Sequence, residues 1–139
     1  MPPKALELGF TGQTVARNIA RIRAERGLSL RELADLMPES RKLNHAQLSA
    51  AERGVRQVTV DDLTAISVAL SVSPVALLMP ASDSEDGGRV ALTGTGEHSP
   101  AELLDWLTGE YDLASDPEDA YAQETHRRAS LPPWRWTKK

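Results

Sequence analysis

Apolar positions at helical spacing run through the first half of the chain. Val15, Ile19 and Ile22 recur every three or four residues, and Gly27 follows as a C-terminal stop. This spacing predicts a first amphipathic helix, which starts near Thr14. Residues 1–12 hold two prolines and two glycines without a clear period, and we expect an N-terminal arm there.

Four further helices are expected before Pro80. Each is preceded by a residue that caps helix N-termini, and these residues are Ser29, Asn44, Thr59 and Ser73. Glu32 and Asp62 stand three residues after the first and third of these, which is the spacing of a capping box. Gly54 ends the third helix, whose apolar face is Leu48 and Ala51. Residues 13–80 are therefore predicted to form a compact five-helix bundle.

The second half of the chain has weaker signals. Residues 81–98 are rich in Ser, Asp, Gly and Thr and are interpreted as a linker, with one possible short strand at 89–92. In residues 99–139, Ser99-Pro100 and Asp116-Pro117 each predict the start of a helix. The prolines after Leu131 favour an extended tail. The whole chain is thus predicted to be all-α.

Composition agrees with this and excludes several classes. The 139 residues include 40% hydrophobic but only 4% aromatic residues, which suits a helical core. No cysteine is present, so disulfides, thiolate zinc sites and thiol nucleophiles are excluded. No apolar stretch is long enough to cross a bilayer, and the start lacks the apolar region of a signal peptide. We expect a cytoplasmic protein with no membrane contact.

Charge is divided unevenly between the two halves. Residues 1–80 hold ten Lys and Arg against eight Asp and Glu, whereas residues 81–139 hold six against twelve. The net charge of −4 therefore does not exclude a nucleic-acid binder, because affinity depends on where the basic groups cluster. The acidic half is expected to face away from DNA.

The first half resembles the XRE-type helix-turn-helix proteins, which include the Cro and lambda-like repressors of bacteriophages. The resemblance covers about half of the chain and is carried by five motifs in order. They are residues 21–27 (RIRAERG), 28–34 (LSLRELA), 48–54 (LSAAERG), 63–70 (LTAISVAL) and 73–78 (SPVALL). It implies a five-helix lambda-repressor-like fold and binding to double-stranded DNA.

In that family the third helix enters the major groove. The resemblance therefore implies that base edges are read by His45, Ala46, Gln47 and Ala50. Gln47 has the groups for a bidentate pair with adenine, His45 can donate to guanine or phosphate, and the alanines offer only methyl contacts. Phosphate contacts are expected from the start of the second helix and the loop after the third. The candidates for the DNA backbone are Arg31, Arg41, Lys42, Asn44, Arg53, Arg56 and Gln57.

Some of these residues also have structural interpretations. Asn44 is either a helix cap or a DNA contact, and Arg31, Arg53 and Arg56 also fit an ordinary solvated surface. Glu52 is interpreted as the partner of an arginine from the first helix, because a carboxylate near phosphate is repelled.

Two features depart from the family pattern. Leu30 stands where the family has a glutamine that contacts phosphate. The connection at residues 37–43 is about four residues longer than the usual helix-turn-helix turn. It carries Arg41 and Lys42, which either reach the DNA backbone or belong to a looser turn; the sequence leaves both open.

No catalytic or metal-binding pattern is found. His45, His98 and His126 lack partners at ligand spacing, so no cofactor and no enzymatic activity are expected. The apolar residues Leu103, Trp106 and Leu107, together with Trp134 and Trp136 of the tail, form a candidate dimer or partner surface. Packing against the bundle is the alternative for the first three.

These features support three functional hypotheses. The first is a repressor that binds a two-fold symmetric operator as a homodimer. The second is an antitoxin-like protein whose C-terminal half binds a protein partner while the N-terminal domain regulates its own operon. The third is a DNA-targeting subunit of an enzyme.

Overall fold

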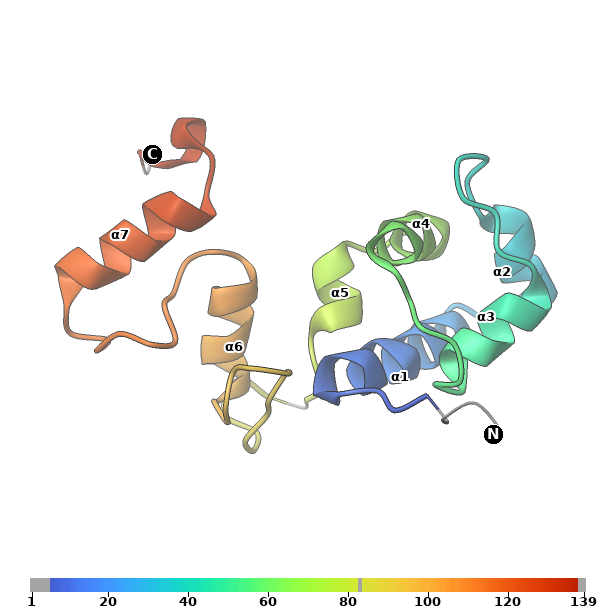
Figure 1. The fold of residues 1–139 in the computed structure, drawn as a ribbon, viewed down its shortest axis with the longest axis horizontal. Helices are drawn as coiled ribbons and strands as arrows, with labels where there is room; N and C mark the ends of the chain where they lie inside the picture. The colour runs from blue at the N-terminus through green and yellow to red at the C-terminus, as the bar shows by residue number, and fades with distance from the viewer. Residues whose placement is uncertain (1–5, 83, 138–139) are drawn as a thin grey trace, which may run out of the picture. The chain divides into compact units, whose positions relative to one another are not determined.

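The computed structural model describes residues 6–82 and 84–137, and its contacts divide the chain into two units between Ala81 and Ser82 (Figure 1). Unit 1 holds five helices, which are α1 (Phe10–Glu25), α2 (Leu30–Leu36), α3 (His45–Glu52), α4 (Val60–Leu70) and α5 (Pro74–Leu78). Unit 2 holds α6 (Pro100–Leu107), α7 (Ala120–Ser130) and a turn of 3-10 helix, η1 (Pro133–Arg135). The predicted all-α fold is confirmed.

The core of unit 1 is built from apolar side chains of all five helices. Each helix contributes at least one residue that is no more than 1% exposed: Ile19, Leu33, Leu48, Ile66, Leu70 and Leu77. Helix α1 packs along α5, and α2 lies beside α3 in the helix-turn-helix pair (Figure 1). Truncating any of these residues to alanine is expected to cost about 2–5 kcal/mol of unfolding free energy.

Asn18 is a buried polar residue that ties α1 to the end of α5. Its side-chain Nδ2 donates to the carbonyl oxygens of Leu77 at 2.9 Å and Met79 at 2.8 Å. The last carbonyls of a helix have no partner within the helix. Asn18 therefore satisfies groups that burial would otherwise leave without a hydrogen bond, and the short helix α5 ends in a defined position.

The predicted capping boxes are present. Ser29 Oγ accepts from Glu32 N at 3.0 Å while Ser29 N donates to Glu32 Oε1 at 3.0 Å. Thr59 and Asp62 form the same reciprocal pair at the start of α4. Gly54, after α3, has a φ of +72°, a left-handed conformation that favours glycine over other residues.

Helix α1 begins four residues earlier than the sequence pattern indicated. It starts at Phe10 rather than Thr14, so part of the expected arm is helical. A Cβ built on Gly12 would lie 3.2 Å from the side chain of Leu8. Leu8 thus packs directly on the backbone at Gly12, where a larger residue would be crowded. Residues 1–5 of the expected arm lie outside the described residues.

Unit 2 contains more order than the linker and tail expected there. Val90 and His98 exchange two backbone hydrogen bonds of 2.8 Å in an isolated antiparallel bridge. Helix α7 is capped by Asp119 rather than by Asp116, whose Oδ1 instead accepts from Glu118 N at 2.9 Å in a preceding turn. The prediction of an extended tail after Leu131 is wrong, because Pro133–Arg135 forms the 3-10 turn η1.

Candidate nucleic-acid interface

Helix α3 presents the residues predicted to read DNA on one side and packs into the core with the other. Leu48 and Ala51 are buried, as their positions in the apolar pattern predicted. Ala46 is exposed, while His45, Gln47 and Ala50 are half-buried. Of these four side chains, only His45 and Gln47 offer hydrogen-bonding groups to base edges.

Asn44 and Gln47 form a capping box at the start of α3. Asn44 Oδ1 accepts from Gln47 N at 2.8 Å, and Gln47 Oε1 accepts from Asn44 N at 2.9 Å. The predicted cap role of Asn44 is confirmed, while its contact with DNA stays a prediction. The role of Gln47 in the box adds to its predicted one, and glutamine three residues after a capping residue is the signature of this box.

Arg23 of α1 locks the C-terminal end of α3. Its Nε and Nη2 donate to the two carboxylate oxygens of Glu52 at 2.5 and 2.9 Å, and its Nη1 donates to Leu28 O at 2.8 Å. The hydrogen bond to Glu52 raises the pKa of Arg23. The predicted pairing of Glu52 with an arginine of the first helix is confirmed. This bidentate pair fixes α3 against α1 and the loop before α2.

Five of the predicted backbone-contact residues are exposed: Lys42 and Asn44, and also Arg31, Arg53 and Gln57. Arg31 lies in the first turn of α2, and among the described residues no hydrogen bond or ion pair holds its side chain. Arg53 donates through Nε to Ser49 Oγ at 3.3 Å, and Gln57 is exposed in the loop after α3. Arg31, Arg53 and Gln57 are therefore accessible to a ligand.

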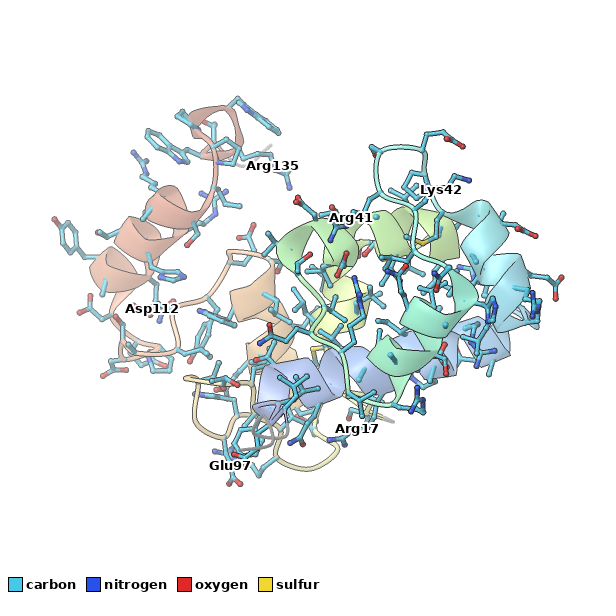
Figure 2. All side chains as sticks on the ribbon, turned by 45° about the vertical axis from the view of Figure 1, so that its right-hand side comes forward. Arg17, Arg41, Lys42, Glu97, Asp112 and Arg135 are labelled. Carbon is cyan, nitrogen blue, oxygen red and sulfur yellow. The ribbon has the colours of Figure 1, made fainter. Side chains whose placement is uncertain are left out.

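The lengthened turn brings Arg41 onto the start of α4. Figure 2 labels Arg41 and Lys42 on this turn. Arg41 Nε donates to Asp62 Oδ1 at 2.8 Å, and Arg56 Nη2 lies 3.8 Å from Asp62 Oδ2. Burial by itself would raise the pKa of Asp62, but Arg41 and the hydrogen bonds from Thr59 outweigh it and leave that pKa below its ordinary value. The sequence predicts Asp62 as a cap residue, and the structure adds its contacts with the two arginines.

Lys42 differs from Arg41 in its surroundings. Its Nζ lies 3.2 Å from Glu39 Oε1, and both side chains are exposed, at 50% and 93%. Pairs of this kind contribute little to stability. Lys42 is therefore free to exchange Glu39 for another anion.

The candidate partner surface of unit 2 is only partly exposed. Leu103 is fully buried, so its assignment to a partner surface is wrong, because in a short helix the buried stripe cannot be told from its neighbours by spacing alone. Trp106 and Leu107 are half-buried, and Leu104, which was not predicted, is 41% exposed. Trp134 is 80% exposed.

Trp136 is held against α7. Its Nε1 donates to Arg128 O at 3.1 Å and Leu131 O at 3.0 Å. Arg128 also lies over its ring, 5.3 Å from the centroid. Trp136 therefore anchors the C-terminal segment to its own helix, whereas Trp134 is left open to a partner.

The ring nitrogens of His98 in unit 2 both have contacts. His98 contacts Thr95 O at 2.8 Å through Nε2 and Glu102 at 3.3 Å through Nδ1. No group of three metal-ligating side chains occurs within residues 6–82 and 84–137. In the same residues, no helix has the length and apolar character that crossing a membrane requires.

Comparison with known proteins identifies the class of unit 1. The model of the helix-turn-helix family matches residues 19–77, which run from α1 to α5. These residues are similar to helix-turn-helix domains of the XRE type, and the match supports a DNA-binding transcription regulator. A crystal structure of the hypothetical transcription factor NHTF from Neisseria is similar, with 25% identity over 58% of this chain and 87% of that chain and a TM-score of 0.46. No curated protein matches the chain.

Proposed function

We propose that this protein represses transcription by binding a two-fold symmetric operator as a dimer. The observation that carries the proposal is the setting of α3. Its C-terminal end is held by the pair of Arg23 and Glu52, and the cationic residues Arg31, Arg53 and Arg56 come from α2 before it and from the residues that follow it. A rigid helix with phosphate-binding groups on both flanks suits entry into the major groove.

The need for a dimer follows from the few base-reading groups. Two alanines among the four candidate positions leave His45 and Gln47 to discriminate bases. A good bidentate pair contributes about 1–3 kcal/mol of discrimination, which is less than the roughly 4–10 kcal/mol that separates specific from non-specific binding. Two copies on adjacent half-sites double the number of contacts. Bound across a promoter, the dimer excludes polymerase.

Selection of bound duplexes from a random pool tests this function. We expect recovered sequences with two inverted half-sites about 10 base pairs apart, bound as two chains per duplex in light scattering. Affinity should fall steeply with salt. Binding of selected and random duplexes with equal affinity at moderate salt would contradict the proposal, and one chain per duplex would remove the dimer.

A second candidate function is an antitoxin-like interaction through unit 2. It is favoured by the exposure of Trp134 at 80% and Tyr121 at 84%, because aromatic residues are common anchors of protein interfaces. Co-purification with the product of an adjacent gene, lost in Trp134→Ala, would support it. A complex that forms equally well with Trp134→Ala would remove Trp134 as the anchor.

A further inference from the structure

One buried carboxylate lies between two arginines that flank α3 in sequence. Asp62 is 1% exposed. Arg41 comes from the turn before α3 and reaches Asp62 Oδ1 at 2.8 Å, while Arg56 comes from the loop after α3 and lies 3.8 Å from Oδ2. Both arginines are candidates for the DNA backbone. The fold thus gathers cations from both flanks of the reading helix at a single anion.

Capping of α4 accounts for only part of what Asp62 does. Oδ2 accepts from Thr59 N at 3.1 Å, and Asp62 N donates to Thr59 Oγ1 at 3.1 Å, which completes the capping box. Oδ1 is not needed for that box. It is used on Arg41, a residue that lies 21 positions earlier in the chain.

Among the described residues, the other contacts in the middle of the lengthened turn stay within the turn: Arg41 N donates to Pro38 O at 3.1 Å, and Lys42 pairs with Glu39. Its ends are anchored by the buried side chains of Met37 and Leu43. Between them, the turn stands over a groove of about 370 Å³ that separates it from Thr64 and Val68 of α4. The ion pair between Arg41 and Asp62 spans from this middle section to α4 and so fixes where the turn lies.

The geometry of the two arginines leaves groups available for an external anion. Arg41 uses its Nε on Asp62, so the outer guanidinium nitrogens remain open on a side chain that is 41% exposed. The Arg56 side chain is 31% exposed, and its buried Nε has no hydrogen-bond partner among the described residues. Two cations share one anion, so one positive charge is left uncompensated at this point.

We propose that Asp62 is a positioning residue of the DNA interface, which holds Arg41 and Arg56 together as a paired site for backbone phosphate. The lengthened turn is then part of the interface rather than a loose connection. This inference rests on the proposed function, since it requires that the α3 side of unit 1 binds DNA. Asp62 itself stays buried behind the arginines and does not touch the duplex.

The variant Asp62→Asn distinguishes two explanations, because an effect of net charge and a positioning role of Asp62 predict opposite changes in DNA binding. Removing a negative charge near DNA strengthens binding if only net charge matters. If Asp62 positions the arginines, the variant loses ordered phosphate contacts, and the slope of log Kd against log salt becomes shallower by about 1 to 2. The probe is a duplex recovered by selection with the unaltered protein, and the readout is fluorescence anisotropy across a series of KCl concentrations.

Arg41→Lys gives a second test in a variant that keeps the net charge. An arginine binds Asp62 through Nε and phosphate through its outer nitrogens at the same time, whereas lysine has a single ammonium group. We expect Arg41→Lys to lower the salt slope by about 1, as Arg41→Ala does. Thr59→Ala is the matched control, because it weakens the cap of α4 while leaving Asp62 and Arg41 in place, and its slope should equal that of the unaltered protein.

The outcomes separate this inference from the proposed function. A wild-type salt slope in both Asp62→Asn and Arg41→Lys overturns the positioning role, and a steeper slope in Asp62→Asn does the same. If Asp62→Asn does not fold by circular dichroism, Arg41→Lys decides alone. The slope of log Kd against log salt can be measured on any duplex. Equal binding of selected and random duplexes would therefore contradict the operator proposal, while the role of Asp62 would still be tested.

Discussion

Gln47 accepts a hydrogen bond from the backbone N–H of Asn44, and this contact couples the start of α3 to the side chain that we predict to read adenine. The Gln47 Oε1 to Asn44 N distance is 2.9 Å. An amide oxygen has two acceptor sites, so Oε1 can keep this bond and still accept from adenine N6 while Nε2 donates to N7. The capping box therefore fixes the Gln47 side chain before DNA arrives, which lowers the entropy cost of the contact.

This coupling predicts that stability and DNA binding separate in two Gln47 variants. Gln47→Ala should lose about 1 kcal/mol of unfolding free energy with the box and about 1–3 kcal/mol of operator affinity. Gln47→Glu keeps an acceptor for Asn44 N and favours the helix N-terminus, so it should be at least as stable as the unaltered protein. Its carboxylate cannot donate to adenine N7, so it should bind the operator more weakly. Urea unfolding and anisotropy check the two effects, and equal operator affinity in Gln47→Ala would remove Gln47 from the reading residues.

The Arg23–Glu52 pair is expected to stabilise unit 1 through its geometry and burial. Its side chains are 21% and 9% exposed, whereas those of the Arg21–Glu25 pair on the same helix are 41% and 60% exposed. Arg23→Ala should cost about 2–3 kcal/mol, because Glu52 is left mostly buried without its partner. Glu25→Ala should cost under about 0.5 kcal/mol. Chemical denaturation of both variants measures the difference, and similar costs in the two would show that Arg23 acts as a surface residue.

Local signals in the sequence predicted the fold of unit 1 well. Capping by Ser29, Asn44 and Thr59 depends on residues within three positions of one another, so the sequence displays it directly. The start of α1 was missed because its first turn has no periodic apolar stripe. Its N-cap is Gly9, without a side-chain cap, so no capping residue marks the start in the sequence. At α7, Asp116 and Asp119 are both good capping residues, and the chain uses Asp116 for a turn instead.

The interface was less predictable where contacts span long stretches of the chain. The residues of α3 follow from the family resemblance and the helical period. The contact between Arg41 and Asp62 could not be predicted in this way, because nothing in the sequence of the lengthened turn indicates which way it folds. In α6, Leu103 and Leu104 are adjacent and equally apolar, yet the first is fully buried and the second is 41% exposed. Tertiary packing decides such cases.

Asp62 also predicts a pH dependence of stability. Its pKa in the folded protein lies below the ordinary value of 3.8. A carboxylate with a lowered pKa stabilises the fold above its unfolded pKa, and this contribution is lost as the pH falls through the folded value. The difference in unfolding free energy between the unaltered protein and Asp62→Asn should thus be largest near neutral pH and shrink below about pH 4. Urea unfolding at intervals from pH 7 to pH 3 measures it, and a difference that stays constant would contradict the assigned charge pairing.

The contacts of Arg127 indicate that it holds the C-terminal segment against α7. Its side chain is 7% exposed, and its Nη1 and Nη2 donate to the carbonyl oxygens of Trp136 and Arg135, both at 2.7 Å, while Nε donates to Glu110 at 3.1 Å. Arg127→Met keeps the apolar stem but removes three charge-assisted bonds, so η1 should detach from α7.

The indole N–H of Trp136 reports on this detachment. It is hydrogen-bonded to two carbonyl oxygens of the α7 end, so its exchange with solvent, followed by NMR, should be slowed in the unaltered protein and fast in Arg127→Met. Trp134, which is 80% exposed, gives an unprotected reference in the same spectrum. Arg128→Met is the comparison variant: it removes the exposed pair with Glu124 at 2.9 Å and the contact with the Trp136 ring, but it leaves the two backbone oxygens that accept from the indole N–H, so most of the protection should remain. Equal protection of Trp136 in all three proteins would show that the segment is held without Arg127.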